Sequence, residues 1–143
     1  MTCVAWDGVT LAADSQLNYG TTRLQCEKLF TLPDGGVVGL AGPAAKCSRL
    51  LRYISGDGPA PKRLLGVHAI RIHANGAADL YAESIEPERI TSRVIAIGCG
   101  GDFAMGCMVA GKTAAEAVAL TIEHDSQCGP PVVTLQPCNQ PPA

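Results

Sequence analysis

A predicted β-hairpin brings a threonine and an aspartate together at the start of the chain. Thr2 opens an apolar run that reaches the turn-forming pair Asp7-Gly8, and a second apolar run leads from that turn to Asp14. A two-residue turn sets Thr2 opposite Ala13, and a three-residue turn sets it opposite Asp14. The hairpin has one of two roles. It only orders the start of the chain, or it also holds the Thr2 hydroxyl beside the Asp14 carboxylate for a chemical function.

A lysine and a second aspartate lie on predicted apolar faces, where a charge needs a partner. Lys28 is in register with the apolar residues of its strand, and a second hairpin turn at 33–36 places it near Gly39 and Leu40. Asp125 shares one face of a predicted helix with apolar residues three and seven positions before it. Because a lysine can extend its ammonium group to solvent, each residue is compatible with a structural or a chemical role.

The histidines and the glycine-rich loop do not indicate a separate active site. His68 and His73 are five residues apart on one predicted strand, so they point to opposite faces and cannot bind a metal together. The segment from Gly98 to Phe103 half-resembles a dinucleotide-binding loop, but its third glycine is missing and no βαβ unit surrounds it. No spacing argues for a Ser/Cys–His–Asp arrangement. We expect no nucleotide cofactor.

Seven cysteines are many for a chain of 143 residues, but their spacing predicts no local metal site. The sequence contains no Cys-x-x-Cys pair of the kind that local zinc sites use. An odd number of cysteines also argues against a disulfide framework. We therefore expect most of them to be small buried apolar residues, with no metal bound. They occupy positions 3, 26, 47, 99, 107, 128 and 138.

The composition is that of one globular domain without a surface for nucleic acid or membranes. Apolar residues make up 47% of the chain and charged residues 17%, and the net charge of −2 gives no positive footprint for nucleic acid. No apolar run approaches the roughly 20 residues that cross a bilayer, and the first residues do not form a signal peptide. We expect a cytoplasmic protein with a single domain at 1–136 and a flexible proline-rich tail at 137–143.

The predicted elements come in separate blocks of strands and helices, which indicates an α+β fold with largely antiparallel sheets. Strands with apolar residues on both faces, such as 94–97, indicate sheets that are covered on both sides, hence a layered sandwich. A capping box from Thr113 to Glu116 opens the last helix, and residues 15–25 form a polar loop. Strands are predicted at 2–6, 9–13, 28–32, 37–41, 66–73, 77–83, 93–97 and 132–135, and helices at 44–54, 102–110 and 113–126.

Six short motifs, in order along nearly the whole chain, resemble those of the N-terminal nucleophile hydrolases. The resemblance is to the proteasome β-type subunits and their small bacterial and phage relatives. The motifs are Thr2 before a β-hairpin, Leu-Ala-Ala-Asp14 at its end, Lys28-Leu-Phe, Gly39-Leu-Ala-Gly42, Ala96-Ile-Gly-Cys-Gly100 and Asp125-Ser-Gln-Cys-Gly129. This resemblance implies a four-layer αββα sandwich. The short segment between the first helix and residue 66 implies that one helical layer is reduced.

The resemblance implies a threonine peptidase in which the start of the chain is the nucleophile. After removal of the initiating methionine, the Thr2 hydroxyl would attack a peptide carbonyl with its own α-amine as the base. An α-amine has a pKa of about 8, so no catalytic histidine is needed. Lys28 would stabilise the alkoxide and Asp14 would hold Lys28. The Gly39 N–H would stabilise the oxyanion, and Asp125 would fix the amine and its water.

The resemblance also assigns residues beside the nucleophile and the substrate. Cys99 and Cys128 stand where the family has serines around the amine. We expect them to lie within several ångströms of each other, either as inert thiols or as a pair that oxidation bridges, which requires Cα atoms within about 7 Å. The family's specificity-pocket positions correspond to Cys26, Val37 and Ala41, which implies a modest apolar substrate side chain.

Because the family forms rings, the resemblance implies a homo-oligomeric ring of six or seven subunits in one or two tiers. Such a ring would cleave unfolded polypeptides that an ATPase unfoldase supplies. Two alternatives stay open: an inactive ring-forming scaffold of the same fold, and a small-amide hydrolase that uses the same site. Removal of Met1 separates active from inactive forms, because an amide nitrogen at Thr2 cannot act as a base. Threonine is small enough at the second position for ordinary methionine removal.

Overall fold

The first sheet contains the hairpin at the start of the chain and has four antiparallel strands. The computed structural model describes residues 2–138. The strands lie in the order β10-β1-β2-β11, which places the first hairpin in the middle of the sheet. Their bounds are Val4–Trp6 for β1, Leu11–Ala13 for β2, Ile95–Ile97 for β10 and Val133–Leu135 for β11. Strands β2 and β11, from the two ends of the chain, therefore lie side by side in this sheet.

The second sheet is a five-stranded antiparallel meander in the order β5-β6-β7-β8-β9. Leu29 pairs with Gly39, so the predicted hairpin register, with Lys28 near Gly39 and Leu40, is confirmed. The strand bounds are Leu29–Thr31 for β5, Val37–Ala41 for β6, His68–Ile72 for β7, Ala78–Ala82 for β8 and Glu88–Ile90 for β9.

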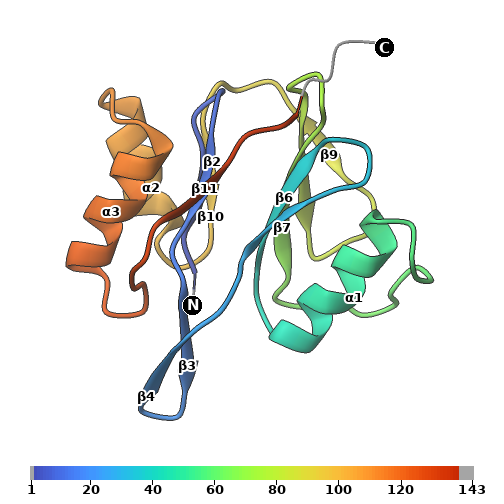
Figure 1. Cartoon of the computed structure of the whole chain (residues 1–143), viewed down its shortest axis with the longest axis horizontal. Coiled ribbons are helices and arrows are strands. Elements are labelled where there is room, and N and C mark those ends of the chain that lie inside the picture. Colours follow the sequence, from blue (N-terminus) through green and yellow to red (C-terminus); the bar gives the residue numbers. More distant parts are fainter. Residues whose placement is uncertain (1, 139–143) are drawn as a thin grey trace.

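The helices cover the outer faces of the two sheets, as Figure 1 shows. Helices α2 (Gly101–Val109) and α3 (Ala114–His124) pack on the first sheet, and α1 (Ala44–Ile54) packs on the second. The layers therefore follow the order α, β, β, α, and within residues 2–138 the outer layer on the second sheet contains α1 alone. The predicted α+β sandwich with one reduced layer is confirmed.

Three apolar clusters lie between these layers, which explains why strands such as β1 are apolar on both faces. Between the sheets, Val4 and Leu11 of the first pack against Ile70 and Ile72 of the second. The opposite face of the first sheet packs on α2 and α3 through Ala5 and other small residues. Small side chains bring the layers close together, in keeping with the low aromatic content of 4%.

The first hairpin has a longer turn than the sequence predicted. Val4 pairs with Ala13 and Trp6 with Leu11, so the turn contains four residues, not two or three. The Asp7 carboxylate accepts hydrogen bonds from the N–H groups of residues 9 and 10, which stabilises this wider turn. Cys3, and not Thr2, is consequently the residue opposite Asp14, with the Asp14 N–H donating to the Cys3 carbonyl at 3.1 Å.

Three of the strands were not predicted from the sequence. Residues 15–25, expected as a polar loop, form the two-stranded ribbon β3–β4 (Gln16–Tyr19 and Thr22–Gln25), which projects from the end of the molecule in Figure 1. Strand β9 was also missed. The side chains of both segments are mostly exposed, so the sequence contains little of the burial pattern from which strands are predicted.

Both ends of α3 are well defined. The predicted capping box is confirmed, with Thr113 and Glu116 each accepting a hydrogen bond from the other's backbone N–H. Asp125 ends the helix as its C-cap residue, so it lies at the end of the helix and not on its inner face. No helix within residues 2–138 is long and apolar enough to span a membrane.

The proline-rich tail starts close to the second sheet. The Cys138 N–H donates to the Gly35 carbonyl at 2.8 Å, so the first residues of the predicted 137–143 tail are held against the β5–β6 turn. The rest of that prediction, like the predicted removal of Met1, lies outside the described residues.

Candidate active site

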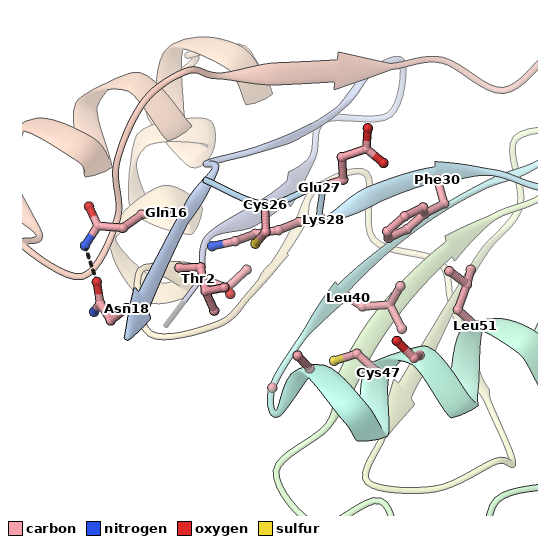
Figure 2. Close-up of a pocket in the computed structure, with 14 residues that line it drawn as sticks. Thr2, Gln16, Asn18, Cys26, Glu27, Lys28, Phe30, Leu40, Cys47 and Leu51 are labelled. Atoms are coloured by element: carbon pink, nitrogen blue, oxygen red, sulfur yellow. Dashed lines mark hydrogen bonds between the residues drawn. The ribbon is translucent and has the colours of Figure 1, made fainter. Parts of the chain in front are cut away.

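Thr2 lies between two cavities and is only 5% exposed. The first cavity, of about 210 Å³, also contacts Lys28 and extends to helix α1. Figure 2 shows Thr2 and Lys28 on one side of it and Cys47 and Leu51 of α1 on the other. The second cavity, of about 530 Å³, is bordered by Thr2, the end of β6 and the loop after β10. An extended ligand could therefore pass over Thr2 with groups on both sides.

A buried ion pair lies beside Thr2. The Lys28 ammonium donates to the Asp14 carboxylate at 2.9 Å, and their side chains are 6% and 0% exposed. Two buried charges at this distance stabilise one another, while each alone would be strongly unfavourable. The pair holds the cationic end of Lys28 at the edge of the first cavity, next to Thr2 in Figure 2.

Three backbone N–H groups also donate to the Asp14 carboxylate. They belong to Cys3 at 3.0 Å, Gln16 at 3.1 Å and Gly129 at 3.1 Å. Asp14 therefore ties together the start of β1, the start of β3 and the loop after α3. Because Cys3 follows Thr2 directly, this network fixes the position of Thr2 although the two side chains are not cross-strand partners.

The glycine-rich loop after β10 closes over the backbone of Thr2. The Gly100 N–H donates to the Thr2 carbonyl at 3.3 Å. At Gly98, which has a φ of +92°, a Cβ atom would collide with the Thr2 carbonyl, so only glycine fits there. This loop, which half-resembles a dinucleotide-binding segment in the sequence, positions Thr2 and has no βαβ surroundings.

Cys99, Asp125 and Cys128 converge next to this loop. Their two sulfur atoms and one carboxylate oxygen all lie within 4.8 Å of one another. The Cys99 thiol is 3.5 Å from the Asp125 carboxylate and 3.6 Å from the carbonyl of Thr2. The predicted closeness of the two cysteines, 29 positions apart, is confirmed, while their bridging on oxidation stays a prediction because all seven cysteines are free thiols here.

Two thiols in this region are held in their neutral form. Burial raises the pKa of the Cys3 thiol to about 12. Burial, followed by the nearby Asp14, Cys99 and Asp125, raises the pKa of the Cys128 thiol well above its ordinary value. Both cysteines therefore act as apolar packing residues in the free protein.

Comparison with known proteins agrees with this architecture. No protein-family model and no curated protein sequence matches the chain. Solved structures do match: Thiobacillus denitrificans BPH has a TM-score of 0.74 and 18% identity, over 94% of this chain and 96% of that one. The same protein in complex with epoxomicin has a TM-score of 0.72 and 16% identity over the same shares. Eukaryotic HslV from Trypanosoma brucei has a TM-score of 0.68 and 19% identity, over 94% and 98% of the two chains.

The chain has the proteasome-like N-terminal nucleophile hydrolase fold. The resemblance of the six sequence motifs is thereby confirmed at the level of the fold. Within this proteasome-like fold, Thr2, Asp14 and Lys28 come together at one end of the sandwich, and the segments that contain Cys99, Asp125 and Cys128 close the same end.

Two residues assigned from the sequence do not reach this site. Gly39 lies inside the sandwich, where a Cβ atom would be 2.5 Å from Val4 and 2.9 Å from Leu29. Val37 is 1% exposed in the core between the sheets and lines neither cavity beside Thr2. The predicted oxyanion role of Gly39 and the predicted substrate contact of Val37 are therefore wrong.

Gly42, the last residue of the same motif, borders the cavities beside Thr2, which Gly39 does not. The Leu40 N–H donates to the Lys28 carbonyl at 3.1 Å, so it points toward β5. N–H directions alternate along a strand, so the Gly39 N–H faces β7. The same alternation, continued one residue past the end of β6, turns the Gly42 N–H to the side of β5, beyond the pair of Leu40 and Lys28. Gly42 also lines both cavities.

The remaining assigned residues fall on different sides of Thr2. Cys26 lines the first cavity and Ala41 the second. Gln16, which was not predicted as a site residue, lines the first cavity and donates to the Ser126 carbonyl at 3.0 Å. His68, for which no site role was predicted, lines the second cavity. Only the unpredicted ribbon β3–β4 brings Gln16 here, so no local pattern could have identified it.

Proposed function

We propose that this chain is a threonine peptidase of the proteasome type, with Thr2 as its nucleophile once Met1 has been removed. The observation that carries the proposal is the buried Lys28–Asp14 pair at the cavity edge beside Thr2. A buried cation next to a hydroxyl favours the alkoxide that nucleophilic attack requires. The shared proteasome-like fold supports the same assignment.

The reaction would proceed through an ester on Thr2. The Thr2 hydroxyl transfers its proton to the α-amine as its oxygen bonds to the substrate carbonyl carbon. The tetrahedral intermediate then breaks its carbon–nitrogen bond, and the leaving amine takes the proton. Water attacks the resulting ester with the same α-amine as the base, which releases the acid and restores Thr2. Lys28 stabilises the alkoxide, and Asp14 holds Lys28 in position.

Gly42 replaces Gly39 as the proposed oxyanion donor. Gly42 lines both cavities beside Thr2, two residues beyond Leu40, which pairs with Lys28, and the alternation of N–H directions along β6 turns its N–H toward the cavity side. Such a donor typically contributes about 3 kcal/mol to the transition state. Asp125 reaches Thr2 indirectly, because its carboxylate contacts the Cys99 thiol, which in turn contacts the Thr2 carbonyl.

The substrate we propose is an unfolded polypeptide with a modest apolar side chain at the cleavage site. The first cavity has mostly apolar walls at Phe30, Leu40, Cys47 and Leu51, and its volume of about 210 Å³ suits a side chain of moderate size. The open second cavity leaves room for the chain beyond Thr2.

We further propose that the protein acts in the cytoplasm as a ring of six or seven copies, with an ATPase unfoldase as a partner. The ribbon β3–β4 supports self-association, because Leu17, Tyr19 and Leu24 share one face of it and are 39%, 77% and 45% exposed. Exposed apolar surface of this kind is typical of protein contacts. Light scattering coupled to size exclusion should give the mass of six or seven chains, and a monomer alone would contradict the ring.

The decisive experiment combines intact mass with epoxomicin, which is bound in the structure of the Thiobacillus protein. We expect loss of Met1, a single covalent adduct at Thr2 and loss of casein hydrolysis. The variant Thr2→Ala should form the same assembly without adduct or turnover. Hydrolysis by a preparation that retains Met1 would exclude the mechanism.

The same experiment separates the two alternatives. An inactive scaffold would assemble but show neither adduct nor turnover, whether or not Met1 is removed. A small-amide hydrolase would lose Met1 and cleave short amides while leaving casein intact.

A further inference from the structure

Two thiols and a carboxylate form a cluster of possible metal ligands on the loops that close over Thr2. The sulfur atoms of Cys99 and Cys128 and an oxygen of Asp125 all lie within 4.8 Å of one another. The three residues come from the loop after β10, the C-cap of α3 and the loop that follows it. Asp125 and Cys128 are three positions apart in the sequence, but Cys99 lies 26 positions before Asp125, so only the fold completes this donor set.

We propose that Cys99, Asp125 and Cys128 form a binding site for one thiophilic divalent cation, such as Zn²⁺, beside Thr2. Two sulfur ligands and one carboxylate match the donors that zinc takes in proteins, with a fourth position for water. In a zinc tetrahedron with Zn–S of about 2.3 Å and Zn–O of about 2.0 Å, sulfur and oxygen ligands are about 3.5 Å apart. The Cys99 thiol and the Asp125 carboxylate are separated by 3.5 Å.

The surrounding backbone already holds these ligands in place. One oxygen of the Asp125 carboxylate accepts the Gln127 N–H at 2.8 Å, while the other faces Cys99. The Cys128 N–H donates to the Asp125 carbonyl at 3.1 Å. At Gly100 a Cβ atom would lie 3.2 Å from the Cys128 sulfur, so the absence of a side chain there leaves space beside this ligand. Hydrogen-bonded ligands of this kind bind metals better than mobile ones.

Metal binding would exchange protons for the cation. Each cysteine binds as a thiolate, so two protons leave as one Zn²⁺ enters, and the local charge is unchanged. Cys99 is exposed and provides the route of entry from solvent. Thiolate ligands also select against Mg²⁺ and Ca²⁺, which prefer oxygen donors.

The site has a consequence for catalysis that rests on the proposed function. The Cys99 sulfur is 3.6 Å from the carbonyl oxygen of Thr2, so a bound cation lies beside the residue whose α-amine is the proposed base. A cation at this position opposes protonation of that amine. The lone pair of the amine can also bind at the open coordination position of the metal, and it then no longer accepts the proton of the Thr2 hydroxyl. Occupancy of the site is therefore expected to inhibit peptide hydrolysis.

The test measures binding separately from activity, on the full-length Thr2→Ala protein, which has no nucleophile. The reduced, chelator-treated protein is titrated with Co²⁺ and then with Zn²⁺. We expect one Co²⁺ per chain, a near-ultraviolet thiolate-to-cobalt charge-transfer band, release of two protons, and displacement of Co²⁺ by Zn²⁺. Mg²⁺ should give neither the band nor protons.

Single substitutions identify the ligands. Cys99→Ser, Cys128→Ser and Asp125→Asn should each weaken Co²⁺ binding at least tenfold. Cys138→Ser is the matched control, because Cys138 is exposed beside the β5–β6 turn and should leave binding unchanged. Circular dichroism shows whether each variant is folded. If the buried Cys128→Ser variant does not fold, the Co²⁺ affinity of Cys99→Ser tests the site, because Cys99 is exposed and its substitution should not disturb folding.

The proposal is overturned if Co²⁺ gives no charge-transfer band, or if Cys99→Ser binds as tightly as the parent protein. Activity is a second, independent arm: with the Thr2 protein, Zn²⁺ should inhibit casein hydrolysis, and less so in Cys99→Ser. A protein that binds Co²⁺ through these residues but never hydrolyses casein retains the metal site and loses only the proposed function.

Discussion

The Lys28 ammonium and the Asp14 carboxylate form an ion pair of 2.9 Å that is almost fully closed to solvent. The pair links the second sheet to the first, because Lys28 precedes β5 and Asp14 follows β2. The same carboxylate accepts N–H groups from Cys3, Gln16 and Gly129, so one side chain joins four segments around Thr2. Asp14 therefore helps to fix the position of the proposed nucleophile through its contact with the adjacent Cys3.

Removing the Asp14 charge should destabilise the whole domain. In Asp14→Asn the Lys28 ammonium stays buried without its counter-charge, and losses of about 3–5 kcal/mol in the free energy of unfolding are typical of such changes. Chemical denaturation measures this loss. Asp34→Asn is the matched control: its pair with Arg71 has the same 2.9 Å length but Asp34 is 48% exposed, so the loss should be much smaller. Equal losses in the two variants would contradict the role given to Asp14.

Alanine at the two glycines of β6 should separate folding from catalysis. In Gly39→Ala the new methyl group meets Val4 and Leu29 in the core, and overpacking of this kind costs about 1–3 kcal/mol. The folded fraction should keep its kcat. In Gly42→Ala the methyl group meets the Gly66 carbonyl, which displaces the proposed oxyanion donor, so kcat should fall about a hundredfold. A normal kcat in Gly42→Ala would contradict its assignment.

The layered fold could be predicted because its signals are local. β1 and β2 contain apolar residues on both faces, and the capping box at Thr113 defines the start of α3 within one residue. The ribbon β3–β4 was missed because only the first of its residues is buried, and its apolar side chains at Leu17, Tyr19 and Leu24 are exposed. Burial on a sheet determines the pattern that sequence analysis detects, and the ribbon has little of it.

The site was predicted less completely because it depends on register. The turn is one residue longer than the three-residue turn that would have placed Thr2 opposite Asp14, so the partner of Asp14 is Cys3, a change that no propensity could indicate. Gly39 and Gly42 flank the same motif, and only the strand pairing shows which N–H faces the cavity. The closeness of Cys99 and Cys128 was predicted from the sequence. The position of the Asp125 carboxylate beside both sulfur atoms is known only from the structure.

Stability should fall in acid partly through Asp7. Burial opposes the Asp7 charge, but the N–H groups of Ala114, Thr10 and Val9 outweigh it and hold the pKa of this carboxyl below its ordinary value of 3.8. A lowered carboxyl pKa contributes stability above 3.8, which is lost as the pH falls through the folded-state pKa. In Asp7→Ala, urea denaturation between pH 5 and about 2 should show a shallower decline than in the parent protein. An unchanged slope would contradict this contribution.

Filling the first cavity should change which substrates are cleaved. Cys47 lies on α1 across this cavity from Thr2, so Cys47→Phe introduces a ring where the substrate side chain is proposed to bind. Small differences in pocket size change selectivity on the order of tenfold or more. The ratio of kcat/KM for peptides with leucine to that for peptides with alanine at the cleavage site should therefore fall by about this factor. Leu65→Phe, at an exposed position outside the cavity, should leave the ratio unchanged. Equal losses for both peptides in Cys47→Phe would mean that the cavity does not select the side chain.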